Sequence, residues 1–171
     1  MKYETCLISG VGLSYKLLAF DQSTAKTGWA FFDGSKLVDY GLINKSKIGD
    51  SNERIKSMFF AITEKINELK PDVVIVEGVQ REASPAVTMM LARLEGMIIG
   101  YLYEHDINMF SVTPTTWRSK IGFKQGGGVK RNELKAMAIK FAHDTFNVDV
   151  ESDDIADAIC IGTAMNVVFE V

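Results

Sequence analysis

A chain of 171 residues that is 47% hydrophobic and 24% charged has the composition of a globular protein and the length of one domain with its own core. No apolar stretch reaches the roughly 18 residues that a membrane span requires, and the two cysteines, Cys6 and Cys160, exclude a disulfide framework or a zinc site. The net charge of −3 argues mildly against a nucleic-acid-binding protein, although the distribution of charge matters more than its sum.

Residues 1–15 are expected to form an extension before a single domain over residues 16–171. The extension does not resemble a signal peptide, because its basic start is thin and its apolar stretch is broken, so we expect a cytoplasmic location. Apolar periodicity predicts five strands, over residues 16–21, 28–32, 36–43, 72–77 and 107–112. It predicts helices over residues 51–69, 87–102, 115–121 and 134–142, and a last helix from about residue 152.

This order of elements predicts an α/β fold with a mixed five-stranded sheet, in which three antiparallel strands precede β-α-β crossovers and helices flank the sheet. Asp21 ends the first strand and Glu77 ends the fourth. Because the arrangement brings the ends of these strands together, we expect the two carboxylates to meet. A carboxylate on an otherwise buried strand is costly unless something pairs with it.

A second pair of acids, Asp154 and Asp157, stands three residues apart on the last predicted helix and therefore shares one of its faces. With Asp21 and Glu77 they bring four oxygen donors to one spot, as hard cations such as Mg²⁺ require. Two cations about 4 Å apart are common machinery for breaking phosphodiester bonds. Each acid also has a structural explanation, namely a turn cap, an ion pair, or favourable charge at a helix N-terminus. Their joint occurrence in the order strand, strand, helix favours the metal site.

Positive charge is concentrated between Thr113 and Lys140, where seven basic residues face one acid, Glu133, so this stretch carries about +6 in an acidic protein. A solvated helix face and a phosphate-contacting surface both explain such a run. The flexible Gly126–Gly128 triplet within it raises the weight of the second explanation. The basic residues are Arg118, Lys120, Lys124, Lys130, Arg131, Lys135 and Lys140.

Three motifs carry a family resemblance. The first runs from Asp21 through a small polar turn to Gly28, the second is Val76-Glu77-Gly-Val, and the third is Asp154-Ile-Ala-Asp157-Ala-Ile. Over roughly residues 17–168 the motifs and their spacing resemble the RuvC family of Holliday-junction resolvases, within the ribonuclease H-like superfamily. The compact size and divergent motifs resemble the phage-encoded members of that family.

The resemblance implies a homodimer that binds branched DNA, in particular four-way junctions, and nicks one strand per subunit at symmetric positions. Asp21, Glu77, Asp154 and Asp157 would hold two Mg²⁺ ions per active site, with Mn²⁺ as a substitute, and the products would carry 5′-phosphate and 3′-hydroxyl ends. It places Arg118 and Lys130 at the DNA backbone and the second long helix near the dimer interface. It also implies the cytoplasm of a bacterium or of a phage-infected host, and no branch-migration partner is expected.

One departure from the family concerns DNA opening. Bacterial members carry an aromatic wedge three residues after the second acid, where this chain has Gln80, followed by Arg81. We therefore expect Gln80 and Arg81 to contact DNA without a stacked aromatic, together with Arg118, Lys120, Lys124, Lys130 and Arg131. Selectivity for four-way junctions over forks, and any preferred cleavage sequence, stay open.

Three other functions compete with junction cutting. An actin-like ATPase also begins with an aspartate-led phosphate loop, but that fold needs two such domains and this chain supplies one. A ribonuclease H acting on RNA–DNA hybrids would use the same acids. A non-catalytic protein that binds branched DNA is the last alternative, although clustered acids would only repel phosphates in such a protein.

Overall fold

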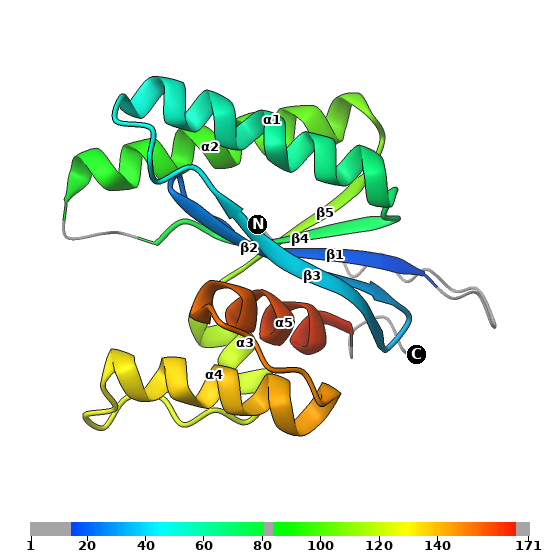
Figure 1. The fold of residues 1–171 in the computed structure, drawn as a ribbon, viewed down its shortest axis with the longest axis vertical. Coiled ribbons are helices and arrows are strands. Elements are labelled where there is room, and N and C mark those ends of the chain that lie inside the picture. The colour runs from blue at the N-terminus through cyan, green and yellow to red at the C-terminus, as the bar shows by residue number, and fades with distance from the viewer. Residues whose placement is uncertain (1–14, 81–83, 167–171) are drawn as a thin grey trace.

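The computed structural model describes residues 15–80 and 84–166, and it has three layers, with two helices on one face of a central sheet and three on the other (Figure 1). All but the last residue of the expected extension over residues 1–15 lies outside the described residues. Tyr15, at its end, donates a hydrogen bond from its hydroxyl to the side chain of Asn166 at 2.5 Å.

The sheet is mixed and five-stranded, as the sequence predicts, and its strand order is β3-β2-β1-β4-β5. β1 pairs antiparallel with β2 and parallel with β4, while β2 pairs antiparallel with β3 and β4 parallel with β5. β1 and β4 therefore lie side by side at the centre of the sheet. The strands are β1 (Lys16–Asp21), β2 (Lys26–Asp33), β3 (Lys36–Asn44), β4 (Val73–Glu77) and β5 (Asn108–Val112).

The helices divide between the two faces of the sheet, with α1 and α2 on one face and α3, α4 and α5 on the other (Figure 1). α5 lies directly against β1 and β2, and α4 packs on α5 as an outer element. The helices are α1 (Ser51–Leu69), α2 (Pro85–Glu104), α3 (Pro114–Lys120), α4 (Arg131–Phe146) and α5 (Asp153–Asn166). The α1 bounds match the prediction, and its cap is Asp50, whose carboxylate accepts from the backbone N–H groups of Asn52 and Glu53.

The two central strands are buried on both faces, which explains their continuous apolar sequences. Successive side chains of a strand point to opposite faces. On β1, Leu17 and Ala19 pack toward α5, whereas Leu18 and Phe20 pack toward α1 and α2. The same alternation on β4 sends Val73 and Ile75 to the α5 face.

α2 corrects one expectation from the sequence, because within the described residues it is long and apolar enough, by length and composition alone, to span a membrane. The apolar run is not continuous in the sequence, because Arg93 and Glu95 interrupt it near the middle of the helix. One face of the helix packs into the core through Leu94, Ile98 and Leu102. Much of the rest is exposed, and that apolar surface needs a separate explanation.

Candidate active site

Asp21 and Glu77 end the two central strands, and both project toward the α5 face. On β1 and β4 the residues before them, Phe20 and Val76, pair in the parallel register and point to the opposite face. By alternation the next residue on each strand turns toward α5. The predicted meeting of the two strand ends is therefore confirmed.

The first turn of α5 brings the second acid pair to the same place. Asp154 and Asp157 lie one turn apart on this helix, and the Ser152 hydroxyl donates to the Asp154 carboxylate at 3.1 Å. β2 approaches this turn closely at Gly28, which pairs with Asp21 across the β1–β2 ladder. A Cβ atom on Gly28 would stand 1.9 Å from the backbone oxygen of Asp154, so only glycine fits there. The motif glycine thus lets α5 reach the strand ends.

All four predicted acids line one pocket of about 490 Å³, together with Asp153. The same pocket is lined by three basic residues, Arg118 on α3 and Arg131 and Lys135 on α4. Gln22 and Gln80 also line it. A pocket that combines acids with bases suits a ligand that combines cations with phosphate.

The acids repel one another strongly. Burial, and then the charges of Glu77, Asp157, Asp154 and Asp153, hold the pKa of Asp21 well above its ordinary range. Burial and the charge of Glu77 raise the pKa of Asp157 to about 7, against the opposing effect of Arg118. Burial and the proximity of the other carboxylates therefore both disfavour the charged forms of Asp21 and Asp157.

Metal-free protein is expected to lose stability as the pH rises from about 4 to about 7 because of Asp157. In that window the folded state keeps a proton on this carboxyl that the unfolded state has already released, so raising the pH favours unfolding. Thermal denaturation in EDTA at pH 5 and pH 8 measures the slope. Asp157→Asn should remove this part of it, and Mg²⁺ should stabilise the wild type more at pH 8 than at pH 5. If the melting temperatures of the wild type and Asp157→Asn changed equally between pH 5 and pH 8, Asp157 would not be the source of the pH dependence.

Hydroxyl side chains near Asp21 organise the turn between β1 and β2. The Thr27 hydroxyl donates to the Ser23 carbonyl at 2.8 Å and accepts from the Ser23 backbone N–H at 3.0 Å. Gln22, which sequence reasoning missed, is buried, and its amide Nε2 donates to the Glu77 carbonyl at 3.3 Å. This bond ties the end of β1 to the end of β4, directly beside both acids.

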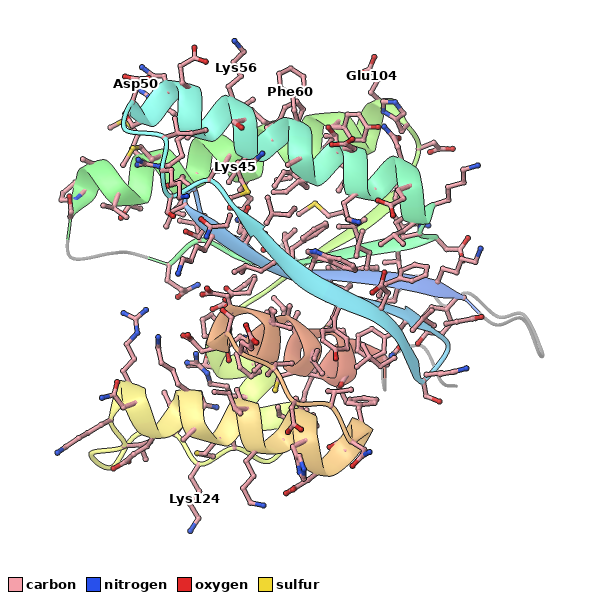
Figure 2. The ribbon with its side chains drawn as sticks, in the orientation of Figure 1. Lys45, Asp50, Lys56, Phe60, Glu104 and Lys124 are labelled. Carbon is pink, nitrogen blue, oxygen red and sulfur yellow. The ribbon has the colours of Figure 1, made fainter. Side chains whose placement is uncertain are left out.

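The predicted DNA-contacting residues separate into two groups. Arg118, Arg131 and Gln80 line the pocket beside the acids. Arg118 also lies over the Trp117 ring, with its guanidinium carbon 4.7 Å from the ring centre. The others stand outside the pocket: Lys120, Lys124 and Lys130 are exposed, and Figure 2 shows Lys124 beyond α4, pointing away from the sheet. Arg81 lies outside the described residues.

The acids fit a divalent cation by chemistry and by charge. Carboxylate oxygens are the ligands of hard cations, and an added positive charge would relieve the repulsion that raises the pKa values of Asp21 and Asp157. Within the described residues, no three acid, histidine or cysteine side chains already stand close enough together to enclose an ion. The carboxylates line an open pocket instead, and they would close on a cation when it binds.

Comparisons with known proteins agree with this site. Residues 17–165 match the profile of the family described as "Crossover junction endodeoxyribonuclease RuvC". A protein of that description from Synechocystis sp. is 30% identical over 156 residues, which cover 86% of this chain and 88% of the relative. One from Fusobacterium nucleatum is 26% identical over 150 residues, which cover 85% of this chain and 77% of the relative. The solved structure "T. thermophilus RuvC in complex with Holliday junction substrate" matches with a TM-score of 0.69 at 13% identity. The match covers 88% of this chain and 91% of that structure's chain.

The structural likeness defines the fold as that of the ribonuclease H-like resolvases, as the sequence predicts. The sequence matches go further, and the chain belongs to the RuvC family of crossover junction endodeoxyribonucleases. The predicted class of enzyme, an endodeoxyribonuclease of the Holliday-junction resolvase type, is confirmed. Membership implies a nuclease that uses a divalent metal.

Proposed function

We propose that this protein nicks four-way DNA junctions, and other branched DNA such as forks, by metal-dependent hydrolysis of a phosphodiester bond. The observation that carries the proposal is one pocket that is lined by four acids, Asp21, Glu77, Asp154 and Asp157, together with Arg118 and Arg131. Membership of the RuvC family and the likeness to a resolvase solved with its junction support it. We further propose that residues 16–171 form one nuclease domain and act in the cytoplasm.

The four acids would hold two divalent cations, Mg²⁺ by preference and Mn²⁺ as a substitute. When bound, such a pair activates the attacking water and stabilises the leaving 3′ oxygen, so that the products carry 5′-phosphate and 3′-hydroxyl ends. The chain itself fixes the ligands: the β1–β4 pairing sets Asp21 beside Glu77, and Gly28 admits the first turn of α5. The guanidinium of Arg118, whose charge already acts on Asp157, would lie beside the scissile phosphate.

The basic residues outside the pocket would bind the DNA backbone. Arg118 and Arg131 connect the pocket to the exposed Lys120, Lys124 and Lys130 along α3, the glycine loop and the start of α4. Backbone contacts of this kind give affinity and orientation rather than sequence preference. Gln80 lines the pocket where bacterial relatives are expected to place an aromatic wedge, so junction opening would rest on polar contacts.

Lys130→Ala is expected to weaken DNA binding equally for all sequences and to flatten the dependence of log K on log[salt] by about 1, as the loss of one phosphate contact does. Affinities for junctions of two different sequences, measured between 50 and 200 mM salt (roughly the range over which backbone contacts dominate), check this. Lys36→Ala, at an exposed position in the β2–β3 hairpin, is the control. Unchanged affinity and slope for Lys130→Ala would remove this residue from the DNA surface.

Paired nicks require two active sites, and we infer a homodimer that forms along α2. Met89, Arg93 and Met97 recur every four residues on this helix, and both methionines are exposed. Arg93 and Met97 also line a groove against Ile55 of α1. An exposed apolar stripe beside such a groove is typical of a surface that a partner covers.

Met97→Glu is expected to shift the protein from dimer to monomer in light scattering, because it places a negative charge in the groove that Met97 lines with Ile55. The monomer should still make single nicks but no longer paired ones. Lys36→Glu, which adds a charge at an exposed site in the β2–β3 hairpin, is the control. A Met97→Glu protein that stays dimeric and makes paired nicks would exclude the α2 interface.

A nicking assay tests the proposed function directly. The substrates are a synthetic four-way junction, a fork, a plain duplex and an RNA–DNA hybrid, each with Mg²⁺ and with EDTA. We expect Mg²⁺-dependent, symmetric nicks in the junction, with the fork cut as well and the duplex left intact. Cutting of the RNA–DNA hybrid alone would show that the protein acts as a ribonuclease H. Junction binding without cutting in any metal would leave a non-catalytic DNA-binding protein.

A further inference from the structure

Lys135 places a positive charge inside the acid pocket, where sequence reasoning counted it only as part of a basic run. It stands four residues after Arg131 on α4, so the two side chains share the helix face that lines the pocket. Its side chain is 37% exposed, and Leu134 beside it also lines the pocket. Lys135 therefore belongs to the pocket wall rather than to the outer surface of α4.

An ion pair holds the Lys135 ammonium in this place. Its Nζ contacts the carboxylate of Asp153, the first residue of α5, so a contact between residues 18 positions apart in the chain joins α4 to α5. Asp153 thus has a cationic partner of its own.

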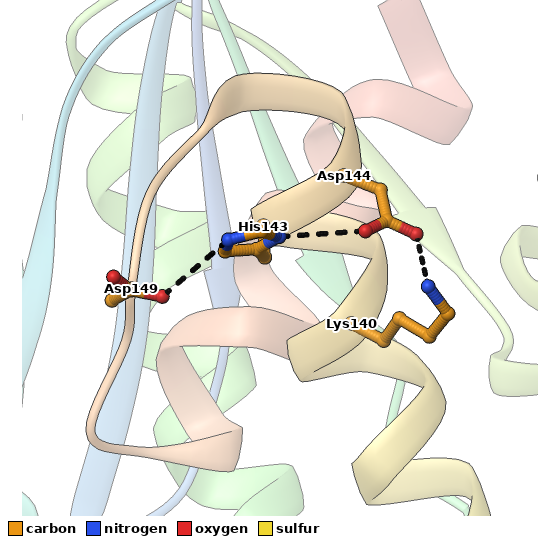
Figure 3. Close-up of polar contacts among 4 residues, drawn as sticks. All are labelled: Lys140, His143, Asp144 and Asp149. Carbon is orange, nitrogen blue, oxygen red and sulfur yellow. Dashed lines mark hydrogen bonds and ion pairs between the residues drawn. The ribbon is translucent and has the colours of Figure 1, made fainter.

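A second lysine on the same helix offers a direct contrast. Lys140 pairs with Asp144 at 2.5 Å within α4, and both side chains are largely exposed. Figure 3 shows this pair with His143, whose other ring nitrogen approaches Asp149 at 4.0 Å. None of these four residues lines the acid pocket. The Lys140 pair is an ordinary surface contact of little energetic weight.

We propose that Lys135 contacts the scissile phosphate, and that Asp153 positions this lysine instead of serving as a metal ligand. An ammonium group has three donors, so Lys135 can keep its bond to Asp153 while donating to a phosphate oxygen. The pair and the four candidate ligands line the same pocket, so a phosphate held there by cations would come within reach of the lysine. Negative charge that develops on the phosphate during hydrolysis is stabilised by a fixed cation of this kind.

The inference rests on the proposed junction cutting, and single-turnover kinetics tests it. Cleavage of a four-way junction by excess enzyme is measured for Lys135→Met, Lys135→Arg, Asp153→Asn and the control Lys140→Met. Junction affinity is measured separately in an Asp21→Asn background, so that cutting does not interfere. We expect Lys135→Met to lower the cleavage rate constant by about 100-fold, as loss of one transition-state donor does, while affinity changes by less than about threefold. Lys135→Arg should retain most of the wild-type cleavage rate constant. Lys140→Met should match the wild type in both rate constant and affinity.

The Mg²⁺ dependence of the rate separates the two roles for Asp153. If Asp153 only positions Lys135, Asp153→Asn lowers the rate and leaves the Mg²⁺ midpoint unchanged. If Asp153 is itself a metal ligand, the midpoint rises by more than the roughly 10–100-fold that follows loss of a residue supporting a ligand. Wild-type cutting by Lys135→Met, or a loss of affinity as large as its loss of rate, would overturn the inference while leaving the proposed function intact. Junctions left uncut by the wild type itself would instead contradict the proposed function. Circular dichroism of each variant checks that it is folded, and Lys135→Arg provides a variant that keeps the positive charge.

Discussion

Junction cutting is expected to fall sharply when any one of three pocket acids is neutralised, by Asp157→Asn, Asp21→Asn or Glu77→Gln. The loss should be far larger than the roughly 10–100-fold that follows when a residue only supports a metal ligand. Each change removes one anionic oxygen donor from the wall that would hold the cations and leaves a side chain of the same shape. Because the pKa values of Asp21 and Asp157 are raised by burial and mutual repulsion, the same substitutions should also stabilise the metal-free fold at pH 8. Activity falls while the melting temperature in EDTA rises.

The opposite signs of these two effects make the prediction specific. A variant that loses activity because it is misfolded would lose melting temperature as well. Asp149→Asn is the matched control, since this aspartate is 97% exposed and does not line the pocket, and it should leave both quantities unchanged. Near-normal cutting by any one of the three pocket variants would contradict the four-acid site.

Gly28→Ala is expected to lower the free energy of unfolding by about 3 kcal/mol, at the upper end of the usual cost of overpacking, and to abolish most cutting. The new Cβ would stand 1.9 Å from the carbonyl oxygen of Asp154 and 2.8 Å from the backbone nitrogen of Ile155. Neither is the end of a flexible side chain, so the start of α5 must move away from β2. That movement displaces Asp154 and Asp157 from Asp21 together.

Urea denaturation and single-turnover cutting measure the two consequences for Gly28→Ala. Gly49→Ala is the control, because a Cβ at Gly49 has no heavy atom within 4 Å among the described residues. A fully stable and active Gly28→Ala protein would show that β2 and α5 do not approach as closely as the structure has them. A Gly28→Ala protein that is less stable but fully active would show that the acids keep their arrangement when the start of α5 is strained.

The central part of the fold could be predicted because its strands are buried on both faces. Runs such as residues 73–76 are continuously apolar, so a charged residue at the end stands out, and parallel pairing then brings Asp21 beside Glu77. The helix bounds followed from periodicity and caps, although α4 begins three residues before the predicted start at residue 134. There the Glu133 carboxylate accepts from the Lys130 backbone N–H, which extends the helix toward the glycine loop.

The basic residues that line the pocket could not be predicted, because their place depends on packing between distant elements. Lys135 reaches Asp153 only because α4 lies against α5, and nothing in the spacing of basic residues distinguishes it from Lys140. Gln22 follows Asp21 in the sequence, but its bond to the Glu77 carbonyl depends on the β1–β4 pairing. The basic run was therefore read as one surface, whereas the structure divides it into pocket residues and exposed ones.

Anomalous scattering from Mn²⁺ in crystals of the protein with a four-way junction tests the central claim most directly. The account predicts two Mn²⁺ peaks about 4 Å apart in the pocket, with oxygens of Asp21, Glu77, Asp154 and Asp157 as their protein ligands and Asp153 still paired with Lys135. Absence of a peak among the four carboxylates, in crystals that carry Mn²⁺ elsewhere or that hold cleaved DNA, would contradict it.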